Sequence, residues 1–269
     1  MNEYDALIKS IKRKRKTVVI LTIVAVLIAI TLCSPIYIGS EDNPIVDYKG
    51  IPPVYMVIII VAILIIEIIA YGLVSIPLVA SMEIECNPEK HLILNDILNN
   101  QKNKDNIYST DFLYMGNFKS SLEYSIKMVS SDKPPMITMG LFNKARCEFF
   151  LGDFDSLKAT VTQYENTLNS TNKINQKVRN VYDKILKTMN LLVAISNEDK
   201  EQISAFSNIE VWNNSKATEC YVNYLKGLAA FNLNDKEEAV SRLTYVKENG
   251  DKTVFAQFAE EYLFKLNNI

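Results

Sequence analysis

Histidine and tryptophan are almost absent from this chain, which has one residue of each among its 269. A zinc site of Cys and His ligands, or a Ser–His or Cys–His catalytic pair, would have to use the single His91. This residue is interpreted as a partly exposed surface histidine. No two of the four cysteines lie at the spacing of metal ligands. They are predicted to be buried or idle thiols: Cys33, Cys86, Cys147 and Cys220.

The chain also has few glycines and prolines, and its positive and negative charges nearly balance. Eight glycines and eight prolines argue against a long flexible linker and a turn-rich all-β fold. The formal net charge is −2 with no basic stripe, which argues against a nucleic-acid groove. The motifs GxGxxG, GxxxxGK(S/T), GxSxG and HExxH are missing. We therefore expect no catalytic residue, no metal, no cofactor and no evident small-molecule substrate.

Two long apolar runs are the clearest feature that is present. The first, about Thr17 to Ile36, has no charged residue, and as a helix rising 1.5 Å per residue it covers the ~30 Å hydrocarbon core of a bilayer. The second runs from about Val54 to Leu78. Because a backbone in lipid must satisfy its own hydrogen bonds, both runs are predicted to be transmembrane helices. Together they form a two-helix membrane anchor over residues 17–80.

The flanking cations predict how this anchor is oriented. Residues 1–16 are basic, whereas the connecting loop 37–53 carries Lys49 as its only cation. The positive-inside rule places the N-terminus in the cytoplasm and the loop outside. The chain then returns, so the C-terminal part is cytoplasmic and the protein is a two-span protein of the cell membrane. Six cations precede the first span: Lys9, Lys12, Arg13, Lys14, Arg15 and Lys16.

A cleaved signal peptide and a lipoprotein are alternatives for the first run. The run is longer than a typical signal core, and no small-x-small cleavage pattern follows it. Lipidation at Cys33 normally requires a small residue before the cysteine, where this chain has Leu32. Both alternatives are therefore disfavoured.

Glu67 is the only ionisable residue inside a predicted span. A carboxylate at mid-bilayer is costly and often marks an ion or proton relay or a helix–helix contact. The alternative is a protonated side chain packed against Thr22, Thr31 or Ser34 of the first span. With one such residue and two helices, the packing interpretation is favoured.

The rest of the chain has the pattern of helical hairpins. Residues 81–106 are predicted to form a juxtamembrane helix that starts at Asn87-Pro88, followed by a polar linker. In residues 224–246, small residues on a first helix precede a turn at Asn234-Asp235, and Ala239, Leu243 and Val246 share one face of a second helix. Similar units have turns at Gly116, Gly152 and Asn197-Glu198-Asp199, and Phe255–Leu266 suits a terminal capping helix.

These units resemble the tetratricopeptide repeat family. The resemblance is carried by LGDF at 151–154 and GLAAFNLNDKEEA at 227–239, with units spaced by roughly 36 residues. Lys236 replaces the turn aromatic, Ser121 and Leu157 replace the usual alanine, and no proline closes the units. The resemblance implies a cytoplasmic helical solenoid over residues 107–269. With the two transmembrane helices predicted from the apolar runs, the expected fold is all-α.

The resemblance also implies a function, a membrane-anchored and non-catalytic module that docks an unidentified protein partner. A small transporter subunit or sensor that uses Glu67 is the alternative, and an enzyme is a more distant one. The candidate groove residues lie on the presumed first helices of the hairpins: Asn143, Arg146, Asn180, Asn223 and Lys226.

Overall fold

The computed structural model describes residues 4–33, 36–40, 43–47, 53–98, 104–170 and 175–268. In these ranges the chain forms twelve helices and one two-stranded β-hairpin. It divides into two compact units, Met1–Pro77 and Leu78–Ile269, which are described in turn.

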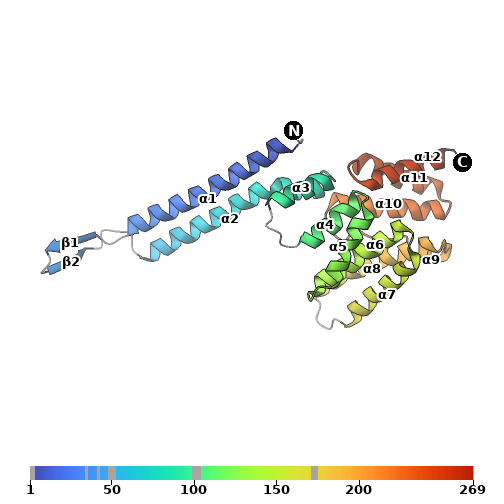
Figure 1. Cartoon of the computed structure of the whole chain (residues 1–269), viewed down its shortest axis with the longest axis horizontal. Helices are drawn as coiled ribbons and strands as arrows, with labels where there is room; N and C mark the ends of the chain where they lie inside the picture. The colour runs from blue at the N-terminus through green and yellow to red at the C-terminus, as the bar shows by residue number, and fades with distance from the viewer. Residues whose placement is uncertain are drawn as a thin grey trace. The chain divides into compact units, whose positions relative to one another are not determined.

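The first unit has two long helices and the hairpin, drawn in blue in Figure 1. The elements are α1 (Asp5–Cys33), β1 (Ile36–Ser40), β2 (Asn43–Asp47) and α2, which covers Pro53–Glu83 and so extends into the second unit. The strands are antiparallel, with Ile36 opposite Asp47. The predicted external loop 37–53 therefore contains a β-hairpin, and the all-helical class is confirmed apart from this element.

Helices α1 and α2 lie side by side (Figure 1) and share a seam. The less exposed residues of α1 recur every three or four positions, as do those of α2. This is the 3.5-residue period by which paired helices keep one seam in contact. The seam residues of α1 are Val18, Thr22, Ala25 and Ala29, and those of α2 are Ile63, Glu67, Ala70 and Val74.

Among the described residues, one helix is long and apolar enough to cross a membrane, over Val57–Glu83 of α2. Its side chains are largely exposed, as Ile66 (65%) and Ile68 (71%) show, so it is not the core helix of a soluble unit. The predicted first span is shorter than expected, because α1 ends at Cys33 and Ile36 begins a strand. From Thr17 to Cys33 the uncharged part of α1 is about 25 Å long, below the ~30 Å of a hydrocarbon core.

The second unit contains ten further elements in pairs of consecutive, mutually packed helices. These helices are α3 (Pro88–Leu98), α4 (Lys104–Tyr114), α5 (Phe118–Val129), α6 (Pro134–Leu151), α7 (Phe154–Ser170), α8 (Gln176–Ser196), α9 (Lys200–Phe206), α10 (Lys216–Asn232), α11 (Lys236–Asn249) and α12 (Val254–Asn267).

Helix α3 begins at Pro88 as predicted, and the Asn87 side chain accepts a hydrogen bond from the Lys90 amide at 3.0 Å. The predicted linker over 99–106 is partly wrong, because α4 already begins at Lys104. Residues 99–103 of that linker, and the inserted residues 171–174, lie outside the described residues.

The four predicted hairpin turns share the same local structure. Each turn has a residue with positive φ where the first helix ends: Gly116 (80°), Gly152 (76°), Glu198 (53°) and Asn234 (62°). Each is followed by a residue whose side chain accepts a hydrogen bond from a backbone N–H of the second helix: Asn117, Asp153, Asp199 and Asp235. A left-handed residue ends one helix and the next residue caps the following one, so the direction change is encoded locally.

The helix pairs close on one another through aromatic rings. Phe255 of α12 contacts Tyr114 of α4 with ring centroids 5.4 Å apart, and Phe258 of α12 contacts Phe118 of α5 at 6.3 Å. Phe150 of α6 also lies 5.8 Å from Phe258. In an open solenoid each repeat contacts only its neighbours. Here the last helix contacts the first hairpin, so the predicted solenoid is not confirmed.

Glycines allow the closest helix approaches. A Cβ added to Gly140 of α6 would lie 2.7 Å from the Met128 Cβ, 2.9 Å from the Val129 nitrogen and 3.0 Å from the Ser125 oxygen of α5. Two of these atoms belong to the backbone and cannot move aside. The α5–α6 packing therefore depends on a residue with no side chain at position 140.

Replacing Gly140 with Ala should lower the free energy of unfolding by about 1–3 kcal/mol, because the added methyl overpacks a backbone contact. The measurement is urea unfolding of the full-length protein in detergent, followed by far-UV circular dichroism. Gly72→Ala is the matched control, since nothing lies within 4 Å of its Cβ. Equal midpoints for both variants would contradict the close approach of α5 and α6.

Candidate functional site

The second unit contains a cavity of about 450 Å³. It is lined by the first helices of three hairpins (α4, α6 and α10), by the segment 212–215 that precedes α10, by His91 of α3, and by the last turns of α2. Its walls mix aromatic, apolar and hydroxyl side chains. A volume of this size is typical of sites for small molecules.

Arg146 of α6 lines this cavity and is nearly buried, with 2% of the residue exposed. Its guanidinium carbon lies 4.3 Å from the ring centre of Phe142, 5.0 Å from that of Tyr221 and 5.7 Å from that of Tyr114. The negative faces of these rings stabilise a cation. The positive charge of Arg146 lowers the pKa of Tyr114, but the larger effect is burial, which raises that pKa.

Only part of the guanidinium is hydrogen-bonded. Its Nη2 donates to Oδ1 of Asn143, whereas Nε and Nη1 are buried and have no acceptor among the described residues. The hydroxyl of Tyr221 is also buried without a hydrogen-bond partner in the described part of the chain. The Tyr114 hydroxyl is a further partner of the guanidinium. Buried donors are rarely left unpaired in folded proteins, and Nε and Nη1 still have no acceptor in the described residues.

A buried polar chain holds Asn143, and through it Arg146, in place. The amide of Asn143 donates to the Ser109 hydroxyl at 2.8 Å, and that hydroxyl lies 2.7 Å from the Ser125 hydroxyl. The Ser121 hydroxyl donates to the Ser109 carbonyl at 2.6 Å and accepts from the Cys147 thiol at 3.1 Å. Burial raises the pKa of Cys147 to about 11, so this thiol stays protonated at neutral pH.

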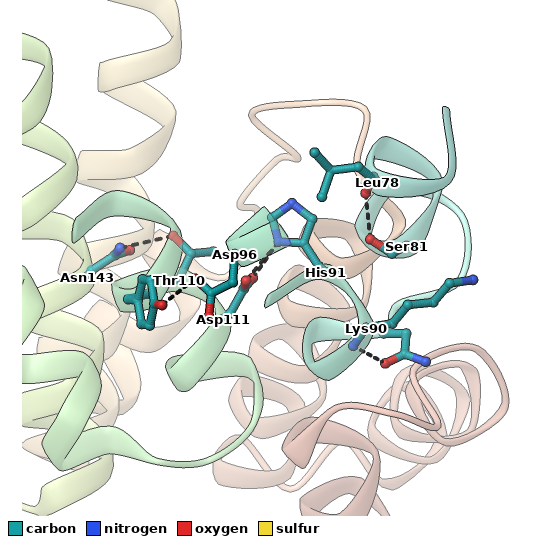
Figure 2. A network of polar contacts seen from close by, with 10 residues as sticks. Leu78, Ser81, Lys90, His91, Asp96, Thr110, Asp111 and Asn143 are labelled. Carbon is teal, nitrogen blue, oxygen red and sulfur yellow. Dashed lines mark hydrogen bonds and ion pairs between the residues drawn. The ribbon is translucent and has the colours of Figure 1, made fainter. Parts of the chain in front are cut away.

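The single histidine forms a pair with a buried carboxylate on the same cavity. Figure 2 shows His91 of α3 reaching Asp111 of α4, with Nδ1 2.8 Å from Oδ2 and 3.0 Å from Oδ1. Burial raises the pKa of Asp111, and the contact with His91 opposes this shift. An ionised carboxylate only accepts hydrogen bonds, so Nδ1 of His91 is the donor of this contact when Asp111 is ionised. The expectation of a partly exposed histidine is confirmed, since its side chain is 20% exposed, and the pairing with Asp111 is an addition to it.

The pair lacks the third member of a catalytic triad. Among the hydrogen bonds of the described ranges, none joins the second ring nitrogen of His91 to a serine, threonine or cysteine. The pair instead fixes α3 against α4. The Tyr108 hydroxyl of α4 also donates to Asp96 of α3, which is a second contact between these helices.

The predicted groove residues are separated by the fold. Asn143 and Arg146 are buried, at 0% and 2% exposure, and so cannot form an open docking surface. Asn180 is exposed on α8, where Gln176 donates to its side chain at 2.9 Å. The inner face of the first helices is filled by aromatic rings and α12, which the helical pattern alone could not reveal.

Asn223 and Lys226 lie one turn apart on α10, but Asn223 is buried, at 9% exposure. Lys226 lines another cavity, of about 260 Å³, together with Arg242. Arg242 of α11 donates to Asn223 at 3.0 Å and to Glu238 at 2.7 Å. Burial lowers the pKa of Lys226, and the nearby positive charges of Arg242 and Lys187 lower it further, whereas the carboxylates of Glu238 and Glu210 oppose this shift. These cations lie close enough to repel one another.

The fold also brings together two thiols that are 134 residues apart in the sequence. The sulfur atoms of Cys86 and Cys220 are 3.9 Å apart, and both side chains are buried. Cys147 is buried as well, so the prediction of buried thiols is confirmed for these three residues. The side chain of Cys33 lies outside the described residues.

Glu67 lines a cavity of about 200 Å³ in the first unit, together with Thr22 of α1. Thr22 is one of the partners that the packing interpretation names. Thr31 instead donates to the Leu27 carbonyl of its own helix at 2.8 Å, and Ser34 lies outside the described residues. Glu67 therefore faces the α1–α2 seam, in agreement with a helix–helix contact.

No protein-family model, no curated protein and no solved structure matches this chain. The residues of the site therefore have to be judged by their geometry alone. Sequence reasoning missed Asp111, Trp212 and Arg242, because His91, Phe142 and Asn223, which they contact, lie on other elements.

Replacing His91 with Ala should lower the free energy of unfolding by about 1–3 kcal/mol at pH 7, because the buried Asp111 loses its partner. In the Asp111→Asn background, replacing His91 with Ala should lower the free energy of unfolding by much less. The coupling energy from a double-mutant cycle, measured by urea unfolding, is the test. Additive effects of the two changes would show that the pair contributes nothing to the α3–α4 contact.

Proposed function

We propose that the chain is a non-catalytic, membrane-anchored protein whose helical domain docks a partner protein. The observation that carries the proposal is a cluster of four cations around α10, formed by Lys184, Lys187, Lys226 and Arg242. The two-span anchor, the cytoplasmic termini and the tetratricopeptide-like repeat are parts of the same proposal.

The membrane part of the proposal is supported by α2 and by the seam. Helix α2 exposes an apolar surface that only lipid or other membrane helices would cover. The seam places α1 beside α2, and small residues such as Ala25 and Ala70 let the helices approach closely. The lysines that precede the apolar run of α1 can extend their side chains to the headgroups. This compensates for the run being shorter than the hydrocarbon core. Both helices would therefore span as a hairpin, with the basic N-terminus in the cytoplasm.

The docking part is supported by four cations on one face, of which two have no carboxylate partner. Lys184 pairs with Glu210 at 2.8 Å, and Arg242 pairs with Glu238 at 2.7 Å. No acidic side chain in the described ranges forms an ion pair with Lys187 or Lys226. Lys187 donates instead to the Asn208 carbonyl at 2.6 Å. The partner that this face fits is an acidic segment, whose carboxylates would relieve the repulsion among the cations.

The resemblance to tetratricopeptide repeats supports a docking role in the same direction. Four helix pairs share the turn device described above, and such repeats commonly present their helices to a partner. The His91–Asp111 pair joins α3 to α4, as a structural contact in a binding protein would. A transporter or sensor that uses Glu67 has less support, because Glu67 faces the seam beside Thr22.

The topology predicts which positions are reachable from outside the cell. In a cysteine-free background, Lys49→Cys should react with a membrane-impermeant maleimide on intact cells, because the loop is external. Asn268→Cys should react only after the cells are permeabilised. Labelling is read by the mass shift of the protein on a gel. Labelling of position 268 on intact cells would refute the cytoplasmic C-terminus.

Lys226→Glu should reduce capture of the partner by about tenfold or more, because it places an anion against an acidic segment. The measurement is quantitative co-purification from native membranes after crosslinking, with the full-length protein as bait. Lys119→Glu is the matched control, since Lys119 is exposed on α5 away from the cluster. Unfolding midpoints of both variants should equal that of the wild type. Equal capture by a folded Lys226→Glu variant would refute the docking face.

A further inference from the structure

The cavity beside Arg146 has a positive charge without a counter-ion. Two acidic residues line the same cavity, Asp111 and Glu83. Asp111 is held by His91, and Glu83 is exposed. In the described residues, no carboxylate forms an ion pair with Arg146. The lining therefore has one unmatched cation, and its Nε and Nη1 donors lack an acceptor.

The missing acceptor can be described by its chemistry. Guanidinium donors form their strongest hydrogen bonds with carboxylate and phosphate oxygens. One unmatched positive charge calls for one negative charge, and the exposed carboxylate of Glu83 disfavours a second one. One hydroxyl donor is also available on the lining, from Thr110, which accepts from the Asn143 amide at 3.3 Å. These features select a monoanion over a dianion such as a phosphate monoester.

The other lining residues indicate that the rest of the ligand is apolar. Met82, Met139 and Trp212 line the cavity with apolar surface, and the Trp212 ring lies 5.0 Å from that of Phe142, edge to face. Phe142 in turn lies under the guanidinium of Arg146 at 4.3 Å. An apolar wall therefore continues from the charged end of the cavity. A volume of about 450 Å³ leaves room for a small molecule.

We infer that this cavity is a binding site for a small amphipathic monocarboxylate. The carboxylate lies toward the positive charge of the Arg146 guanidinium, and the apolar part lies against Met82, Met139 and Trp212. The site is separate from the proposed docking face, because Lys226 does not line this cavity. A failure of ligand binding at this cavity would therefore not refute partner docking, and a failure of partner docking would not refute ligand binding.

Trp212 provides a direct signal for this site, because it is the only tryptophan of the chain and it lines the cavity. The experiment titrates the full-length protein in phosphatidylcholine nanodiscs with cyclohexanecarboxylate and follows Trp212 emission. Cyclohexanecarboxamide is the neutral probe of the same shape. A saturable change with the acid, and at least tenfold weaker binding of the amide, is expected. No saturable change, or equal binding of both probes, would overturn the proposal without any variant being needed.

Variants then assign the binding to Arg146. Arg146→Gln should weaken binding of the acid by about tenfold or more, because it removes the charge-assisted donors. Arg146→Lys keeps the charge and should bind more tightly than Arg146→Gln. Arg179→Gln makes the same change outside the cavity and should bind as the wild type does. An Arg146→Gln protein with wild-type circular dichroism and wild-type affinity would overturn the assignment.

The source of the carboxylate is distinguished by the lipid. Nanodiscs that contain oleic acid should suppress the response to cyclohexanecarboxylate if the site takes a fatty acid from the membrane. An undiminished response in those nanodiscs assigns the site to a water-soluble acid. Either result supports a monocarboxylate site and identifies where its ligand comes from.

Discussion

The guanidinium of Arg146 is a charge that the domain interior holds without a carboxylate partner in the described residues. Burying an ion costs on the order of several kcal/mol, so its surroundings must offset that cost. The ring faces of Tyr114, Phe142 and Tyr221 and the amide oxygen of Asn143 do so in part. These residues lie on α4, α6 and α10, so accommodating one charge brings three hairpins to a common point.

The same centre explains why the helix pairs close on one another. Tyr114 and Tyr221, which face the guanidinium, also contact Phe255 at 5.4 and 5.0 Å, and Phe255 belongs to the last helix. The aromatic rings that stabilise the cation therefore anchor α12 against the first hairpin. What a repeat protein would leave as an open inner face is here divided into a filled aromatic part and a cavity. The cations around Lys226, which form the proposed docking face, lie elsewhere on α10 and α11 and are half exposed.

Local features were predictable from the sequence because their causes lie within a few residues. The turns at Gly116, Gly152 and Asn234 combine a residue that tolerates positive φ with a following cap, and both properties are side-chain chemistry. The apolar helix α2 could be predicted from the composition of its segment alone. The loop before α2 was less predictable, because pairing of β1 with β2 depends on strand register rather than on hydrophobic periodicity.

The sequence by itself determined the apolar helix, the basic N-terminus, the helix pairs and their turns, since each depends on neighbours within one or two helical turns. Only the tertiary structure decided the site. The contacts of His91 with Asp111 and of Cys86 with Cys220 join distant segments, and Arg146 looked like an exposed groove residue until its rings were in place. A helical pattern shows which side chains share a face. What covers that face depends on packing between elements, which the pattern does not contain.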